Sequence, residues 1–245
     1  NATKQKSATM ALLQKESRRF LSSPNYILNC GLGTLLMPIG GIALLLKGPL
    51  LISTLNQIFS YQEGFIAMIL SAVFCFATSI NMVAAPSVSL EGKSLWLLQY
   101  LPVTPWQVLR AKLSLQLILT VTPAIFCLVC IMITAALSPL CFLLMAALLL
   151  SYIFFLALFQ MLLGLKLPNL TWTNEVTPIK QSACVGISLL MAFVYPVVLC
   201  GLYFLIGYKI GFWIYISAFL LITILLCIGL FIWLKKRGTA LFAAL

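Results

Sequence analysis

Long apolar runs, separated by short polar stretches, occupy most of this 245-residue chain. Each run approaches the ~20 residues that a helix needs to cross a ~30 Å hydrocarbon core. A helix on the surface of a soluble protein would instead show an apolar stripe with a period near 3.6 residues. The pattern therefore predicts an all-α, polytopic membrane protein. We expect six transmembrane helices at about 26–47, 65–85, 113–136, 139–167, 178–207 and 211–234.

Three of these spans follow a cap residue and a proline, namely Ser23-Pro24, Ser138-Pro139 and Thr177-Pro178. A hydroxyl at the N-cap and a proline at the first helical position are typical of helix starts. Residues 48–64 are expected to form a loop that includes Glu63, and the tail after Arg237 completes the chain. We divide the chain into an N-terminal segment, 1–24, and a six-span domain, 25–245.

The segment Ser7–Ser22 is predicted to form an amphipathic helix that lies in the membrane interface. One face carries the apolar residues Met10, Leu13, Phe20 and Leu21. The polar residues away from that face are Lys15, Glu16, Arg18 and Arg19.

Composition agrees with a membrane protein, because 63% of residues are hydrophobic and only 8% are charged, against about 25% charged in an average soluble domain. The net charge of +11 does not indicate nucleic acid, since the cations sit beside span ends, where they set topology and meet anionic lipid. With the N-terminus inside, thirteen of the fifteen cations fall on one side, and only Lys47 and Lys209 fall on the other. The positive-inside rule therefore places both termini in the cytoplasm. The chain opens on Asn1 with no initiator methionine and no signal peptide, which suggests a trimmed chain or a piece of a longer one.

No charged residue is expected deep inside any span, and the chain has no histidine. The eight cysteines lie in or beside apolar runs and are interpreted as small packing residues. We therefore predict no catalytic residue, no metal site and no bound cofactor, so that the chain is not an enzyme.

The stretch Ser87–Lys112 contains Gly92-Lys93-Ser94, which looks like the end of a phosphate-binding loop. A genuine loop needs a glycine five residues before Gly92, where this chain has Ser87. The stretch is better explained as a short amphipathic helix from Leu95, broken by Pro102, followed by a second helix that runs into the third span. Thr104 to Gln107 predicts a capping box for that second helix. The aromatic residues here either form an interfacial belt or dock a cytoplasmic protein.

Several stretches resemble the permease subunits of type-2 ABC exporters, in particular a Firmicutes branch of long permeases built from two six-span halves. They are LLQKE at 12–16, RFLSSP at 19–24, APSVSLEGK at 85–93, LPV at 101–103, PN at 168–169, WTNE at 172–175, KQ at 180–181 and KRG at 236–238, with Phe242 and Leu245. The chain is similar to the C-terminal half of such a permease. The resemblance implies a bacterial plasma membrane protein whose loop between the second and third spans forms a coupling helix.

By resemblance, a separate ABC ATPase subunit would bind ATP and Mg²⁺ and contact this coupling region. The implied contact residues are Glu91, Gly92, Lys93, Trp96, Gln99, Tyr100 and Pro102. The loop between the fourth and fifth spans either forms a second cytoplasmic contact or is a simple capped connection. The residues concerned are Trp172, Asn174, Glu175 and Lys180. A second six-span half, either fused or supplied by a homodimer, would complete the pathway.

The leading hypothesis is thus the membrane subunit of an ATP-driven exporter. The alternative is a gradient-driven secondary transporter or channel, with a site built from backbone carbonyls and hydroxyls where Pro123 or Pro196 breaks a helix. The favoured interpretation of these two prolines is a kink whose backbone groups are satisfied by neighbouring helices. A scaffold without transport activity is a third class, and the sequence does not identify a substrate.

Overall fold

A computed structural model describes residues 7–59, 64–135 and 137–245, so that Lys4, Lys6 and Glu63 lie outside the described residues. Helices dominate, and the described residues contain no strand. The helices are α1 (Ala8–Ser22), α2 (Pro24–Cys30), α3 (Leu32–Ile58), α4 (Phe65–Ser79), α5 (Leu95–Tyr100), α6 (Pro105–Thr134), α7 (Pro139–Lys166), α8 (Val176–Lys180), α9 (Ala183–Leu202), α10 (Tyr208–Ile210), α11 (Phe212–Trp233) and α12 (Thr239–Ala244). A 3₁₀ segment, η1 (Ser89–Ser94), precedes α5, and π turns at Tyr203–Gly207 and Leu234–Gly238 follow α9 and α11.

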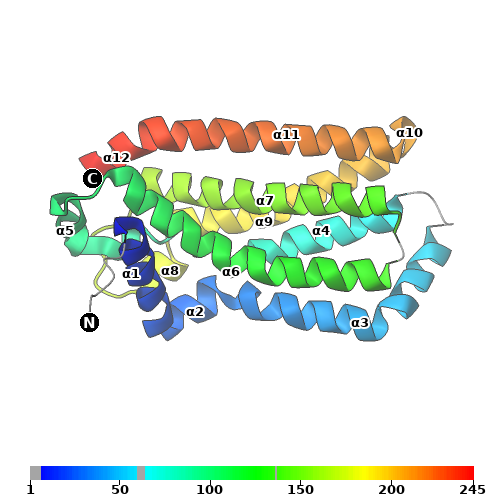
Figure 1. Ribbon diagram of the computed structural model, residues 1–245, viewed down its shortest axis with the longest axis horizontal. Helices are drawn as coiled ribbons and strands as arrows, with labels where there is room; N and C mark the ends of the chain where they lie inside the picture. Colours follow the sequence, from blue (N-terminus) through cyan, green and yellow to red (C-terminus); the bar gives the residue numbers. More distant parts are fainter. Residues whose placement is uncertain (1–6, 60–63, 136) are drawn as a thin grey trace.

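The long helices run side by side along the longest axis of the molecule (Figure 1). Five helical stretches in the described residues are long and apolar enough to cross a membrane: α3, α6, α7, Val176–Ile210 and Phe212–Ala244. The shorter α4 is the sixth apolar helix of the bundle. The predicted all-α, polytopic fold is confirmed.

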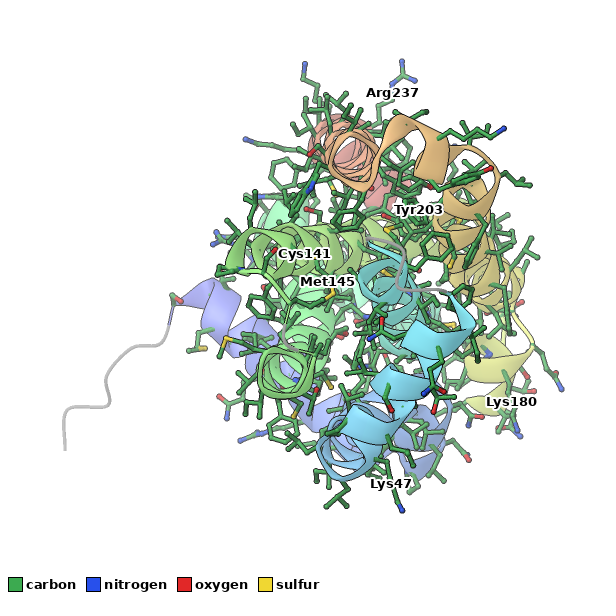
Figure 2. All side chains as sticks on the ribbon, turned by 90° about the vertical axis from the view of Figure 1, so that its right-hand side faces the viewer. Lys47, Cys141, Met145, Lys180, Tyr203 and Arg237 are labelled. Carbon is green, nitrogen blue, oxygen red and sulfur yellow. The ribbon has the colours of Figure 1, made fainter. Side chains whose placement is uncertain are left out.

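The core forms around α7, which is the most buried of the long helices, whereas α11 is the least buried. Tyr152 of α7 stacks on Tyr195 of α9, with ring centroids 4.1 Å apart. The Tyr152 hydroxyl shares a hydrogen bond with Ser79 Oγ at 2.5 Å. Figure 2 shows Met145 among the packed side chains of the bundle, whereas Lys47 projects away from it. Buried hydroxyls in this core therefore have partners inside the protein, as a low-dielectric interior requires.

Two of the three predicted cap-and-proline starts are confirmed. The hydroxyls of Ser23 and Ser138 accept hydrogen bonds from backbone N–H groups in the first turns of α2 and α7. The third is wrong: Thr177 and Pro178 lie inside the short α8, and the long helix starts only after Ser182.

The first predicted span ends too early, because α3 continues past Lys47 and Pro49 to Ile58. The expected loop is therefore helical up to residue 58. Gly48 lies against Thr134 of α6, where an added Cβ would meet that side chain at 3.2 Å. This close packing and the apolar residues beyond Pro49 favour a helix, whose backbone groups bond to one another, over a loop.

The second predicted span ends too late, because α4 stops at Ser79 and residues 81–88 continue as buried, non-helical chain. Asn81 explains the break. Its Oδ1 accepts a hydrogen bond from the Thr34 backbone N–H at 2.9 Å, and its carbonyl accepts one from Gln116 Nε2 at 2.8 Å. Irregular backbone at this depth is tolerated only where protein groups satisfy it, and the side chains of Gln116 in α6 and Gln160 in α7 do so for the Asn81 carbonyl.

The tail after Arg237 is also helical: the π turn at Leu234–Gly238 connects α11 to α12. Phe242 of α12 is buried in the same apolar cluster as Leu95 and Leu98 of α5. The C-terminal helix is thus packed against the short helix that the sequence singled out.

Candidate functional site: a buried ion cluster and an exposed helix

One end of the bundle gathers the short helices α1, α5, α8 and α12 (Figure 1, left). We call it the basic end, because eleven of the described cations belong to segments there, while Lys47 and Lys209 lie toward the opposite end. The eleven are Lys15, Arg18, Arg19, Lys93, Arg110, Lys112, Lys166, Lys180, Lys235, Lys236 and Arg237. This distribution agrees with the predicted asymmetry of charge.

Lys112, in the second turn of α6, is the most buried cation described, with a side chain that has no solvent exposure. Its Nζ donates to Glu91 Oε1 at 2.6 Å, to Glu16 Oε1 at 3.0 Å and to the Ser87 carbonyl at 2.9 Å. All three ammonium donors thus have a partner, which a buried cation needs to offset its lost hydration.

Glu91, at the centre of η1, is equally enclosed, with 3% of its surface exposed. Its carboxylate lies 3.0 Å from Lys15 Nζ and 2.9 Å from Arg19 Nη1, in addition to the contact with Lys112. Burial alone would raise the pKa of Glu91, but Lys112, Arg19 and Lys15 outweigh it and hold that pKa well below its usual value. Glu91 is therefore a carboxylate over the whole physiological pH range.

These five residues, Lys15, Glu16, Arg19, Glu91 and Lys112, form what we call the ion cluster. They come from three segments, α1, η1 and α6. Removing one partner from such a cluster leaves an uncompensated buried charge, which costs about 3–5 kcal/mol. The ion cluster therefore fixes α1 and η1 to the start of a membrane-spanning helix.

The ion cluster corrects one expectation. Glu16 does not point away from the packed face of α1: with Leu12 and Phe20 it forms the buried stripe, while Met10 and Leu21 are exposed. Lys112 is buried within the protein near the start of α6, just before the predicted third span at 113–136, so it does not test the expectation that spans contain no deep charge. The sequence pattern of α1 predicts that Glu16 faces solvent. In the structure it faces inward because it pairs with the buried Lys112.

The loop after α7 packs directly on η1. Trp172 Nε1 donates to the Ser89 carbonyl at 2.6 Å, and the Asn169 backbone N–H donates to Ser89 Oγ at 3.0 Å. Gly92 has φ +50°, and a Cβ there would meet the Trp172 indole at 3.1 Å. Glycine is needed at this position both for its backbone angle and for the space that the indole fills.

Helix α5 presents an aromatic pair to the outside. Trp96 is 58% exposed and Tyr100 is 83% exposed, and their rings meet edge to face with centroids 6.0 Å apart. Leu95 and Leu98 are buried on the opposite face. The predicted capping box at Thr104 and Gln107 is present, and α6 runs without interruption from Pro105 to Thr134, within two residues of the predicted end of the third span.

A family model described as "Membrane protein of 12 TMs" matches residues 4–235 of the chain. The chain belongs to this family. Searches of the curated proteins and of the solved structures found no match. The family description names twelve spans, and the described residues of this family member contain five apolar helical stretches long enough to cross a membrane and one shorter apolar helix, α4.

In this member of the 12-TM family, the residues predicted to contact a partner separate into two groups. Glu91 and Gly92 are buried, and Trp172 is partly covered. The others are exposed: Lys93, Trp96, Gln99, Tyr100, Pro102, Asn174, Glu175 and Lys180. Gln99 also donates to the Phe242 carbonyl of α12 at 3.2 Å.

The two predicted contact regions meet around one hollow of about 510 Å³, lined among others by Arg19, Glu91, Lys93, Trp172 and Glu175. Lys180 is exposed on α8, which follows this loop. The structure thus joins the two regions into one surface, while contact with a partner stays a prediction. Sequence reasoning did not predict that Glu16 and Lys112 lie beneath this surface, because the two residues are 96 positions apart and no local pattern links them.

Proposed function

We propose that the chain is the membrane subunit of an ATP-driven ABC exporter, with a separate ATPase subunit docking on the exposed surface of α5. The observation that carries this proposal is the exposed pair Trp96 and Tyr100 on α5. Helix α5 directly follows η1, whose Glu91 belongs to the ion cluster. An exposed aromatic pair on a rigid support is typical of a protein-binding surface. In this proposal the basic end faces the cytoplasm of a bacterium, as the positive-inside rule requires.

The ion cluster supplies the mechanical link in this proposal. ATP and Mg²⁺ would be bound by the partner, and its cycle would displace α5 and η1. Because Lys112 holds both the Glu91 carboxylate and the Ser87 carbonyl, a displacement of η1 would pull on α6. A helix of 30 residues spans about 45 Å, so this motion would reach the far side of the membrane.

The neighbouring helix α3 would then move with α6. Thr34 Oγ1 of α3 donates to the Leu119 carbonyl at 3.0 Å, and Cys127 Sγ of α6 donates to the Met37 carbonyl at 3.0 Å. We propose that a second six-span half, fused or contributed by another copy, faces this one and that the substrate path opens between them. The twelve spans of the family description support a two-half arrangement.

The experiment is co-purification of the chain with its ATPase subunit, followed by measurement of ATP hydrolysis in proteoliposomes. The double variant Trp96→Ala/Tyr100→Ala should lose ATPase binding. The matched control is Tyr208→Ala, which removes a half-exposed aromatic residue at the opposite end of the bundle. Retention of binding by Trp96→Ala/Tyr100→Ala would remove the basis for the proposal.

The gradient-driven alternative depends on a broken helix. Helices α6 and α9 continue through Pro123 and Pro196, so neither proline breaks its helix, in agreement with the favoured interpretation. The break after α4 lies among the amides of Asn81, Gln116 and Gln160, and Gln160 Oε1 is buried with no hydrogen-bond partner among the described residues. Substrate flux driven by an ion gradient in vesicles without ATPase would favour this alternative, and Gln160→Leu would then abolish it.

A further inference from the structure

A long groove runs along the outside of the bundle between α6, α7 and α11. It consists of two adjoining hollows of about 520 Å³ and 350 Å³, which share the walls Phe154, Leu158 and Phe231. Both volumes fall in the ~300–1,000 Å³ range of small-molecule sites. We call this feature the α6–α11 groove.

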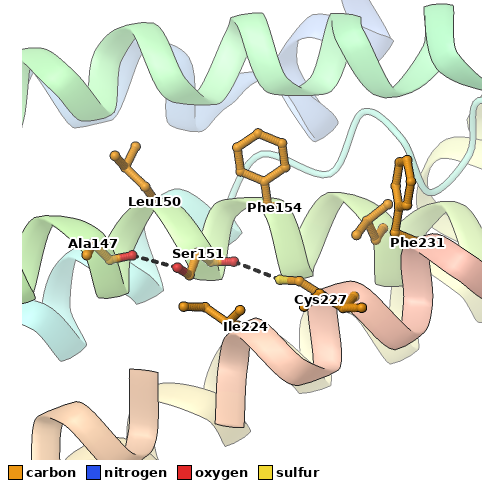
Figure 3. A pocket seen from close by; sticks show the side chains of 9 residues that line it. Ala147, Leu150, Ser151, Phe154, Ile224, Cys227 and Phe231 are labelled. Atoms are coloured by element: carbon orange, nitrogen blue, oxygen red, sulfur yellow. Dashed lines mark hydrogen bonds between the residues drawn. The ribbon is translucent and has the colours of Figure 1, made fainter. Parts of the chain in front are cut away.

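The larger hollow is apolar throughout its length (Figure 3). Its two polar side chains are already bonded to backbone: Ser151 Oγ donates to the Ala147 carbonyl at 2.7 Å, and Cys227 Sγ donates to the Ser151 carbonyl at 3.3 Å. Leu150, Phe154 and Ile224 complete the walls. This part of the groove therefore offers an alkyl chain apolar contact and no free donor.

The smaller hollow is polar at the end nearest the start of α6. Arg110, Ser114 and Trp106 line it there. Arg110 is exposed and has no ion pair or hydrogen bond within the described part of the chain. Trp106 is held by an edge-to-face contact with Phe231, with centroids 5.5 Å apart. The guanidinium of Arg110 thus lies, without a partner in the described residues, at the basic end of the α6–α11 groove.

We propose that the α6–α11 groove binds one anionic phospholipid, with an acyl chain along α7 and α11 and the phosphate on Arg110. A guanidinium pairs with phosphate through two parallel hydrogen bonds. Charge argues against a second copy of this chain as the occupant. The chain carries a net charge of +11 with only four acidic residues. Two of these, Glu16 and Glu91, are already paired with cations of the ion cluster. An anionic head group complements Arg110, whereas another copy would bring mainly positive charge.

The test uses the full chain in lipid nanodiscs whose phosphatidylglycerol or phosphatidylcholine carries brominated acyl chains. Bromine quenches nearby tryptophan fluorescence, and subtraction of the Trp106→Phe signal isolates Trp106 from the other four tryptophans. We expect brominated phosphatidylglycerol to quench Trp106 more strongly than phosphatidylcholine does. Arg110→Gln should reduce that preference about five-fold, the factor that ~1 kcal/mol represents for one cation at a membrane surface.

Two further variants keep the test decisive. Arg110→Lys should retain most of the preference, and Arg237→Gln, which removes an exposed cation of the same end, should leave it unchanged. Because Arg110 has no partner in the described residues, Arg110→Gln should unfold at the same temperature as the wild type. Equal quenching by the two lipids, or an unchanged preference in Arg110→Gln, would overturn the proposal. Absence of quenching by either lipid would also overturn it and would indicate that protein, such as a second six-span half, covers the groove.

Discussion

The ammonium group of Lys112 lies 2.6 Å from the carboxylate of Glu91, and both side chains are buried. Twenty-one residues separate them in the chain, and the contact fixes the 3₁₀ segment η1 to the long helix α6. Lys15, Arg19 and Glu16 extend this contact to α1. The pair therefore determines where the exposed face of α5 is held relative to the bundle.

Glu91→Gln should destabilise the protein strongly, because it removes the negative charge that compensates Lys112 in a site without solvent. We expect a loss of about 3–5 kcal/mol, the range measured when one partner of a buried pair is removed. Thermal unfolding in detergent measures it. Glu175→Gln is the matched control: Glu175 is exposed and accepts one hydrogen bond, from Ser23 Oγ at 3.1 Å, so its loss should cost far less.

Replacing both Glu91 and Lys112 tests whether the two residues stabilise the protein through their interaction with each other. Glu91→Gln/Lys112→Met removes the charge of both residues and leaves Glu16 with Lys15, 3.9 Å away, so the double variant should lose less stability than the sum of the two single variants. If the effects of Glu91→Gln and Lys112→Met simply add, the two residues do not interact and the ion cluster is not the link described here.

The stabilisation by Glu91 should have a characteristic pH dependence. Its folded-state pKa is lowered, so its contribution is fully present above the unfolded-state pKa of about 4.3 and is lost as pH falls from there toward the lowered pKa. The difference in unfolding temperature between wild type and Glu91→Gln should thus be constant from about pH 5 to 8 and shrink below about pH 4. A difference that already shrinks between pH 7 and 5 would contradict the ionised, paired state.

Gly92→Ala should displace Trp172 from the surface of η1. The backbone at Gly92 has φ +50°, which disfavours side chains, and the new methyl group would press on the indole. We expect a loss of about 1–3 kcal/mol, measured by thermal unfolding. Gly186→Ala is the control, because Gly186 lies in α9 with open space around it. That change should be neutral or stabilising by up to about 1 kcal/mol, and equal losses in both variants would disprove the role of Gly92.

The sequence was sufficient for the features that depend on local chemistry. Apolar runs identified the helical membrane class, and the hydroxyl-proline pairs at Ser23 and Ser138 marked helix starts correctly. The capping box at Thr104 also appears as expected. Each of these signals involves residues that are close together in the sequence, so it can be recognised from a single sequence.

Features that depend on distant residues were not predictable in this way. The sequence around Glu16 predicts a surface residue. Glu16 faces inward because it accepts a hydrogen bond from Lys112, 96 positions away. The end of α4 follows from bonds between Asn81 and the side chains of Gln116 and Gln160 in two other helices, and an apolar run gives no sign of them. The length of α3 past Pro49 likewise depends on close packing against α6.

The central claim, that α5 is the docking surface for a separate ATPase, is tested most directly by site-specific photo-cross-linking. A photoreactive phenylalanine analogue replaces Tyr100, and in a second protein it replaces Tyr208 at the opposite end. Each protein is irradiated in membranes that contain the ATPase subunit. Our account predicts a cross-link to the ATPase from position 100 and none from position 208. A bound ATPase that cross-links from neither position, or equally from both, would contradict it.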